Sequence, residues 1–129
     1  MISFESLVLE SGIPIYLQIL LFVKRGAVAG NIHNGDELPS RRVLSALLGV
    51  NPNTVQKAYR MLEEEHLLIS RSGAKSCMVL TEDNIGRIKS DLLEADAKNA
   101  VRALKQMGIS KAEAVQLLNR FWNELEGED

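Results

Sequence analysis

Residues 49–59 read GVNPNTVQKAY, and a helix begins inside this stretch. Asn51 is a residue type that caps helix N-termini, and Pro52 fits the first helical position, where its missing N–H costs nothing. The apolar residues at helical spacing along one face are Val55, Ala58, Tyr59 and Leu62. The stretch therefore predicts an amphipathic helix whose opposite face carries only hydrogen-bonding or cationic side chains.

Two further helices are predicted before this one. Pro14 opens the first and Gly30 ends it, while Ser40 caps a second, short helix that Gly49 ends in the left-handed region. Between them, residues 37–39 are expected to be extended, because a proline disfavours helix at the residue before it. The apolar residues of the short helix are Val43, Leu44, Leu47 and Leu48.

A hairpin and two more helices are predicted after it. Residues 67–71 and 76–80 are rich in strand formers and are separated by a turn at 72–75. Three helices followed by a hairpin make a winged helix. Beyond residue 80, Thr81 caps a helix that Gly108 stops, and Ser110 with Glu113 forms the capping box of a last helix.

The predicted fold class is mainly α with a small β-hairpin: a winged helix-turn-helix in residues 1–80, followed by a two-helix hairpin in residues 81–129. The hairpin carries more apolar surface than two helices can hide between themselves, so it needs a partner surface, either the first domain or a second copy of the chain. The positions expected to form a dimer are Ile88, Leu92, Leu117, Leu118, Phe121, Trp122 and Leu125.

Composition separates two regions of opposite charge. The 129 residues, 46% hydrophobic and 25% charged, allow one modest core plus an accessory element. The net charge of -2 argues against a wholly basic nucleic-acid binder, yet residues 38–62 carry four basic side chains and no acid. Beyond residue 80, acids outnumber bases. A basic middle suggests a surface that faces phosphates, and chance variation between two solvated surfaces is the alternative.

The residues exclude several other classes of protein. No Ser-His-Asp or Cys-His set, carboxylate pair or phosphate-cradling glycine loop can be assembled, so catalysis is not expected. A single cysteine and two histidines lack metal-ligand spacing, and no cofactor is expected. No stretch is long enough for a membrane span or reads as a secretory signal, so the expected location is the cytoplasm.

The sequence resembles the DNA-binding domain of GntR-type bacterial transcription regulators. The resemblance spans residues 12–79 and rests on PIYLQI, on GDELPSRRVLSALLGVNPNTVQKAYRMLE and on LLISRSG. The tail, with LKQMGISKAEAVQLL, resembles the small YtrA-like branch of that family. The resemblance implies a homodimeric regulator that lacks the large effector domain of its relatives.

Carried over by position, the resemblance implies contacts to double-stranded operator DNA from two helices and the hairpin. The candidate residues are Ser40, Arg41, Arg42, Asn51, Asn53, Thr54, Gln56, Lys57, Arg60, Arg71, Gly73 and Lys75. The chemistry agrees, because asparagine and glutamine pair bidentately with adenine and lysine reaches guanine or the backbone. Two positions depart from the family pattern: His66 replaces a glycine, and the wing lacks its second glycine.

Two functions therefore compete. The first is a sequence-specific regulator, a homodimeric repressor that places the helix of residues 51–65 in the major groove over an inverted repeat. The alternative is a winged-helix module for protein-protein interaction. The acid-free outer face of the helix favours DNA. The residues after Leu80 are too few for a separate ligand domain, so an unknown small-molecule effector would bind between tail and winged helix or at the dimer interface.

Overall fold

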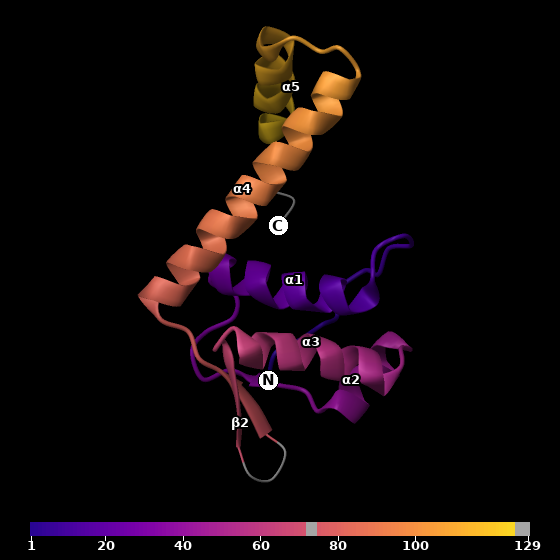
Figure 1. Ribbon diagram of the computed structural model, residues 1–129, viewed down its shortest axis with the longest axis vertical. Helices are drawn as coiled ribbons and strands as arrows, with labels where there is room; N and C mark the ends of the chain where they lie inside the picture. The colour runs from indigo at the N-terminus through magenta and orange to yellow at the C-terminus, as the bar shows by residue number, and fades with distance from the viewer. Residues whose placement is uncertain (72–74, 126–129) are drawn as a thin grey trace. The chain divides into compact units, whose positions relative to one another are not determined.

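The computed structural model describes residues 1–71 and 75–125, and it divides into two compact units, Met1–Ser90 and a second unit that begins at Asp91 (Figure 1). The predicted fold class is confirmed, because the described residues form five helices and a small antiparallel sheet. In chain order the elements are α1 (Ile15–Ala29), β1 (Glu37–Leu38), α2 (Arg41–Leu48), α3 (Pro52–Glu64), β2 (Leu68–Arg71), β3 (Lys75–Met78), α4 (Glu82–Gln106) and α5 (Lys111–Glu124).

The helix ends of the first unit form where the sequence predicts them. Ser40 Oγ accepts a hydrogen bond from the backbone N–H of Val43 at 3.1 Å, which caps α2. Asn51 Oδ1 accepts one from Asn53 N–H at 2.8 Å, which caps α3 one residue before Pro52. Gly49 has a φ of 68°, so the turn between α2 and α3 uses the left-handed conformation that glycine adopts without strain.

The sheet has one strand more than the predicted hairpin. β2 and β3 pair antiparallel, with Ile69 opposite Cys77. The extended segment before Pro39 forms β1, which pairs with the other edge of β3 and places Leu38 opposite Ser76. This third strand connects the segment that leads into α2 to the wing.

The core of the first unit lies between α1, α3 and the sheet. Its side chains come from every element of the winged helix, because each presents one apolar face to the others. The largest fully buried ones are Tyr59, Phe4, Ile19, Leu44, Leu62, Leu67, Met78, Val23 and Val55. In α2 the expected apolar face is only partly covered, since Val43 and Leu47 remain more than half exposed. Leu44 is the apolar side chain that anchors α2.

The segment before α1 adds to this core, which the sequence pattern does not predict. Phe4 is buried and its ring centroid lies 5.1 Å from that of Phe22 in α1. Gln18 fastens the following loop to α1: its side-chain oxygen accepts from Glu10 N–H at 2.8 Å, and its side-chain nitrogen donates to the carbonyls of Glu10 and Ile13, each at 2.9 Å. The first turn of α1 is therefore held in place.

The first turns of α4 belong to the first unit. Thr81 caps α4 as predicted, because its hydroxyl accepts from Asn84 N–H at 3.1 Å, and the Asn84 side chain accepts in return from Thr81 N–H at 2.8 Å. Asn84 also donates to the carbonyl of Val79 at 2.8 Å. Ile88 is 5% exposed and packs within this unit, so it is not available to the dimer surface in which the sequence placed it.

His66 occupies a strained position immediately after α3. Its φ of 62° lies in the left-handed region, where a side chain with a Cβ costs roughly 1–2 kcal/mol. We expect His66→Gly to raise the free energy of unfolding by about 0.5–1 kcal/mol, since part of the relief is offset by the greater entropy of glycine in the unfolded chain. Thermal denaturation of the two proteins measures this change. His33→Gly, at an exposed position, is the control and should not raise the stability. A loss of stability in His66→Gly would show that the imidazole itself stabilises the turn.

Candidate nucleic-acid interface

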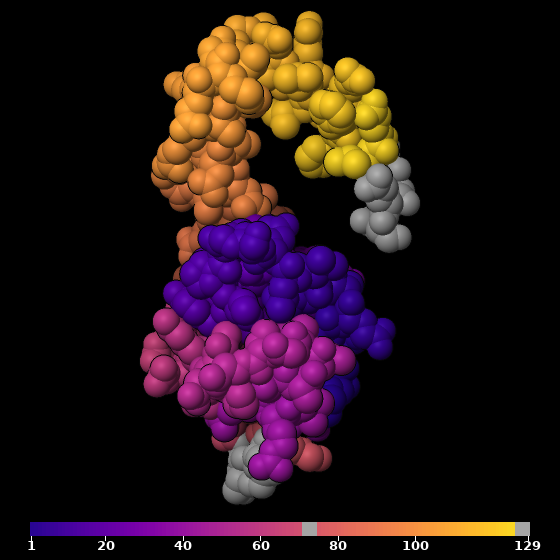
Figure 2. All heavy atoms as spheres, turned by 90° about the vertical axis from the view of Figure 1, so that its right-hand side faces the viewer, coloured from indigo at the N-terminus to yellow at the C-terminus, as the bar shows by residue number. Residues whose placement is uncertain are grey.

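The outer face of α3 is formed by exposed polar and cationic side chains. Asn53, Lys57 and Arg60 are exposed, and Thr54 and Gln56 flank them as half-buried residues. The opposite face carries the buried residues Val55, Ala58, Tyr59 and Leu62. Figure 2 shows α2 and α3, in magenta, as a continuous surface beneath the indigo and purple of the preceding chain. The pattern of residues 49–59 therefore gives the helix face that the sequence predicts.

Charge varies along α3 from one end to the other. Its first turn contains no acid, and the unpaired N–H groups of a helix start carry partial positive charge. The carboxylates lie at the other end, where Glu63 accepts from the Ser70 hydroxyl and Glu65 pairs with Lys24 at 2.6 Å. An approaching polyanion is therefore attracted to the N-terminal half of α3 and repelled from its C-terminal end.

A hollow of about 410 Å³ opens beside the start of α2 and extends the cationic surface. Its lining residues are Pro39, Ser40, Arg41, Arg42, Tyr59, Ser70 and Ser76. Arg41 and Arg42 are exposed, and Ser40 stands at the N-cap of α2. Guanidinium groups, hydroxyls and a helix N-terminus are all groups that bind phosphate oxygens. The predicted residues of α2 are thus brought together next to α3.

Tyr59 connects the two helices beneath this hollow. Its hydroxyl donates a hydrogen bond to the carbonyl of Pro39 at 2.7 Å, immediately before the Ser40 cap. Burial raises the pKa of the Tyr59 hydroxyl above its ordinary value near 10, and the nearby charge of Arg41 offsets part of the rise. The phenol thus stays protonated and keeps donating, which fixes α2 against α3.

Lys57 lies closer to α1 than its place on a helix face alone would indicate. Its Nζ lies 3.9 Å from the centroid of the Tyr16 ring, in the first turn of α1. This distance is well within the range of a cation-π interaction. Sequence reasoning assigned no role to Tyr16; the only signal was its presence in the PIYLQI motif.

The wing positions are described only in part. Lys75 begins β3 and is exposed, with its Nζ 3.9 Å from Glu37 Oε1. The backbone of Arg71 ends β2. Gly73 lies outside the described residues. The predicted contacts of the wing with DNA therefore remain predictions.

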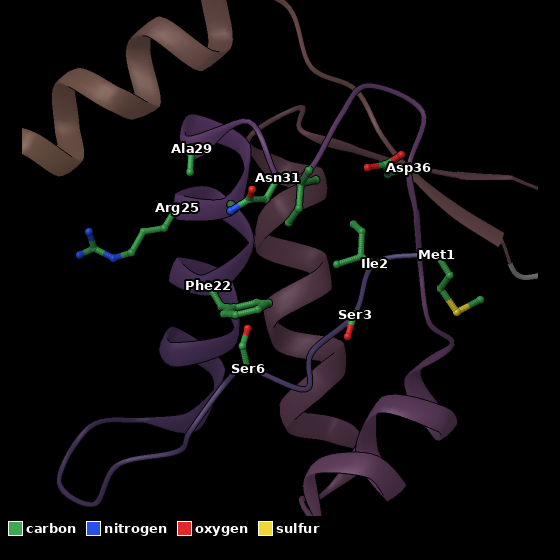
Figure 3. Close-up of a pocket in the computed structure, with 11 residues that line it drawn as sticks. Met1, Ile2, Ser3, Ser6, Phe22, Arg25, Ala29, Asn31 and Asp36 are labelled. Atoms are coloured by element: carbon green, nitrogen blue, oxygen red, sulfur yellow. The ribbon is translucent and has the colours of Figure 1, made fainter. Parts of the chain in front are cut away.

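A larger hollow, of about 630 Å³, lies elsewhere in the first unit, between the N-terminal segment and α1 (Figure 3). The Phe22 and Ile2 side chains point toward one another across it, and Arg25 extends outward. None of the described residues that were assigned to DNA lines it. Within the described part of the chain, no cluster of three His, Cys, Asp or Glu residues forms a metal site, and no helix is both long and apolar enough for a membrane span.

Comparison with known proteins identifies the family to which the chain is similar. Residues 16–77 match the family model described as bacterial regulatory proteins, gntR family. A GntR family transcriptional regulator from Listeria monocytogenes superimposes with a TM-score of 0.76 at 28% identity, over 87% of this chain and 98% of that one. YtrA from Sulfolobus acidocaldarius, a GntR-family transcription factor, is 32% identical with a TM-score of 0.55, over 74% of this chain and 99% of that one.

The chain belongs to the GntR family of bacterial regulatory proteins. It is a transcriptional regulator with a DNA-binding helix-turn-helix, and not an enzyme. The HTH-type transcriptional repressor YtrA of Bacillus subtilis is 43% identical over 64 residues, which are 50% of this chain and 49% of that protein. The resemblance inferred from the sequence is confirmed, and α2 and α3 are the two helices of the helix-turn-helix.

Proposed function

We propose that this GntR-family protein is a cytoplasmic, homodimeric repressor that reads an inverted-repeat operator with α3 in the major groove. The observation that carries the proposal is the outer face of α3, which is free of acids over its N-terminal half and has carboxylates only at the far end. An α-helix fits the major groove, and the helix that reads it places its N-terminal residues on base edges. The charge along α3 favours that orientation.

Base reading is assigned to the amide side chains of α3. Asn53 and Gln56 each carry an amide NH2 group that donates and an amide oxygen that accepts, and these match the N7 acceptor and the adjacent N6 donor of adenine. Arg42, at the start of α2, and Arg60, farther along α3, are exposed cationic side chains, and we assign both to backbone phosphates. The amides therefore supply specificity, while the guanidinium groups supply affinity that falls with salt.

The experiment is a gel-shift series over single-base variants of an operator selected by the protein from random duplexes. Asn53→Ala is expected to cost about 1–3 kcal/mol on the selected sequence and to flatten the preference at one position in each half-site, because a bidentate contact is lost. Arg42→Ala is the matched control and should weaken binding to all variants alike. If Asn53→Ala lowers the affinity for every sequence equally, Asn53 does not read a base.

The homodimer is supported by the second unit, which has no core of its own. Between residues 91 and 125 no side chain is buried, although α4 and α5 carry many large apolar residues. Those that remain exposed are Leu93, Val101, Met107, Val115, Leu118, Phe121, Trp122 and Leu125. Leu92 and Leu117 are half-buried. An exposed apolar surface of this kind is typical of an interface, and a twofold dimer buries the same surface on both copies.

Two features of the operator follow from such a dimer. A twofold protein reads the same bases on each side of its axis, so the operator is an inverted repeat, with half-sites separated by about one helical turn or a multiple of it.

Repression is supported by the B. subtilis relative, which is named a repressor and whose similarity to this chain covers 64 residues. A small regulator that occupies a promoter excludes other proteins from it.

A further inference from the structure

We propose that Tyr16 is a positioning residue that directs Lys57 to a backbone phosphate of the operator. The proposal rests on the proposed insertion of α3 into the major groove. The Nζ atom of Lys57 lies over the Tyr16 ring, 3.9 Å from its centroid. An ammonium group is attracted to the negative face of an aromatic ring within about 6 Å. Tyr16 thus selects one direction for a side chain that otherwise has many.

That direction is toward the α1 edge of the outer face of α3. The neighbouring contact between Lys24 of α1 and Glu65, 2.6 Å long, shows which side of α3 faces α1. Tyr59 and Glu63 face the other way, toward Pro39 and Ser70. Gln56 lies nearest that second side, by helical spacing. Lys57 therefore lies on the side of Asn53 that faces α1, and Gln56 lies on the side that faces away from α1.

An ammonium group at the edge of a recognition helix meets the wall of the groove. The base edges form the floor of the major groove, and the sugar-phosphate strands form its walls. Held against Tyr16, the Lys57 ammonium group lies on the α1 side of α3, away from the side that carries Gln56. The sequence left open whether Lys57 contacts guanine or the DNA backbone. Because the Tyr16 ring holds the ammonium group on the α1 side, the structure assigns Lys57 to a backbone phosphate.

The ring itself has little freedom to move. Tyr16 is half-buried in the first turn of α1, two residues before Gln18. The three hydrogen bonds of Gln18 with Glu10 and Ile13 fix the chain that leads into this turn. A lysine side chain loses rotamer freedom when it binds a phosphate, and a lysine that is already oriented loses less. Because Tyr16 orients Lys57 before binding, less side-chain entropy is lost, and we expect the affinity for DNA to be about two- to fivefold higher than without the ring.

The test is a double-mutant cycle measured as affinity for a mixed-sequence duplex at low salt, since a phosphate contact does not depend on sequence. Tyr16→Leu is expected to weaken binding about two- to fivefold when Lys57 is present and not at all in the Lys57→Met background. Tyr16→Phe keeps the ring and is the matched control, so it should bind like the parent. Lys57→Met alone should lower the slope of log affinity against log salt by about 1.

A second readout reports the contact in the free protein. In nuclear magnetic resonance spectra, the protons next to Lys57 Nζ are expected to be shifted upfield by the ring in the parent and in Tyr16→Phe, and to return to ordinary values in Tyr16→Leu. Melting temperatures of all variants identify any that fail to fold. A variant that merely loosens α1 would lower the melting temperature and would weaken binding in both lysine backgrounds.

Three outcomes overturn the inference. The first is that Tyr16→Leu lowers the affinity for DNA equally with and without Lys57. The second is that Tyr16→Phe and Tyr16→Leu lower this affinity equally. The third is no upfield shift in the parent. Failure of the proposed function looks different, because then Asn53→Ala and Arg42→Ala would leave binding to the selected operator unchanged as well.

Discussion

Phe121→Asp is expected to make the protein monomeric and to weaken operator binding by about 100-fold or more. Phe121 lies in α5 among the exposed apolar residues of the second unit and is itself 44% exposed. In the proposed dimer its ring is buried between two copies. A carboxylate there would be desolvated at the interface, which costs more than the loss of the ring alone.

The effect on DNA follows from linkage of two half-sites. When two recognition helices are joined, the second binds at an effective concentration set by the dimer, and the gain over one site is about 10²–10⁴. A monomer loses that gain although its own α3 is unchanged. We therefore expect operator binding to fall steeply and non-specific binding at low salt to fall much less.

Sedimentation and tryptophan fluorescence measure the first half of this prediction. Trp122 is the single tryptophan and is 77% exposed, so its emission should move to shorter wavelength when the dimer forms and should not in Phe121→Asp. Asn119→Asp adds the same charge at an exposed position of α5 and is the matched control. If Phe121→Asp stays folded and as dimeric as the parent, the dimer lies elsewhere, and α1 is the next surface to test.

How much of this could be read from the sequence depends on the kind of interaction. Helix ends are local, so Ser40, Gly49, Asn51 and Thr81 were predictable from their own side chains and those of near neighbours. The outer face of α3 was predictable for the same reason, because helical spacing alone decides which residues share a face. The family resemblance added the expected roles of these residues in DNA binding, which helical spacing alone does not indicate.

The unpredicted features all join residues that are distant in the chain. The bond from Tyr59 to Pro39, the ring under Lys57 and the burial of Phe4 each need the packed fold before they exist. β1 was expected only as an extended segment, since a strand of two residues has no pattern of its own. The burial of Ile88 was not predicted, because helical spacing shows which residues share a face but not which part of the protein covers that face.

Tyr59→Ala is expected to lower the free energy of unfolding of the first unit by about 3–5 kcal/mol, a large part of the total stability of a small domain. Tyr59 is 2% exposed and contributes both a packed ring and the hydrogen bond to the Pro39 carbonyl. Tyr59→Phe keeps the ring and isolates the hydrogen bond, so it should cost about 1–3 kcal/mol, because a carbonyl next to the core loses its donor. Tyr16→Phe, on the half-buried ring, is the control and should change little.

The same hydroxyl predicts a loss of stability at high pH. Since burial raises the pKa of folded Tyr59, the phenol stays protonated in the fold at a pH where the unfolded chain releases the proton. The contribution of Tyr59 is therefore fully present below pH of about 10, the value for an unfolded tyrosine, and is lost as pH rises through the higher folded value. Urea denaturation at a series of alkaline pH values measures this as a difference between parent and Tyr59→Phe. The two curves of unfolding free energy against pH should converge as pH rises. Curves that stay parallel would mean that Tyr59 ionises in the fold as readily as in the unfolded chain.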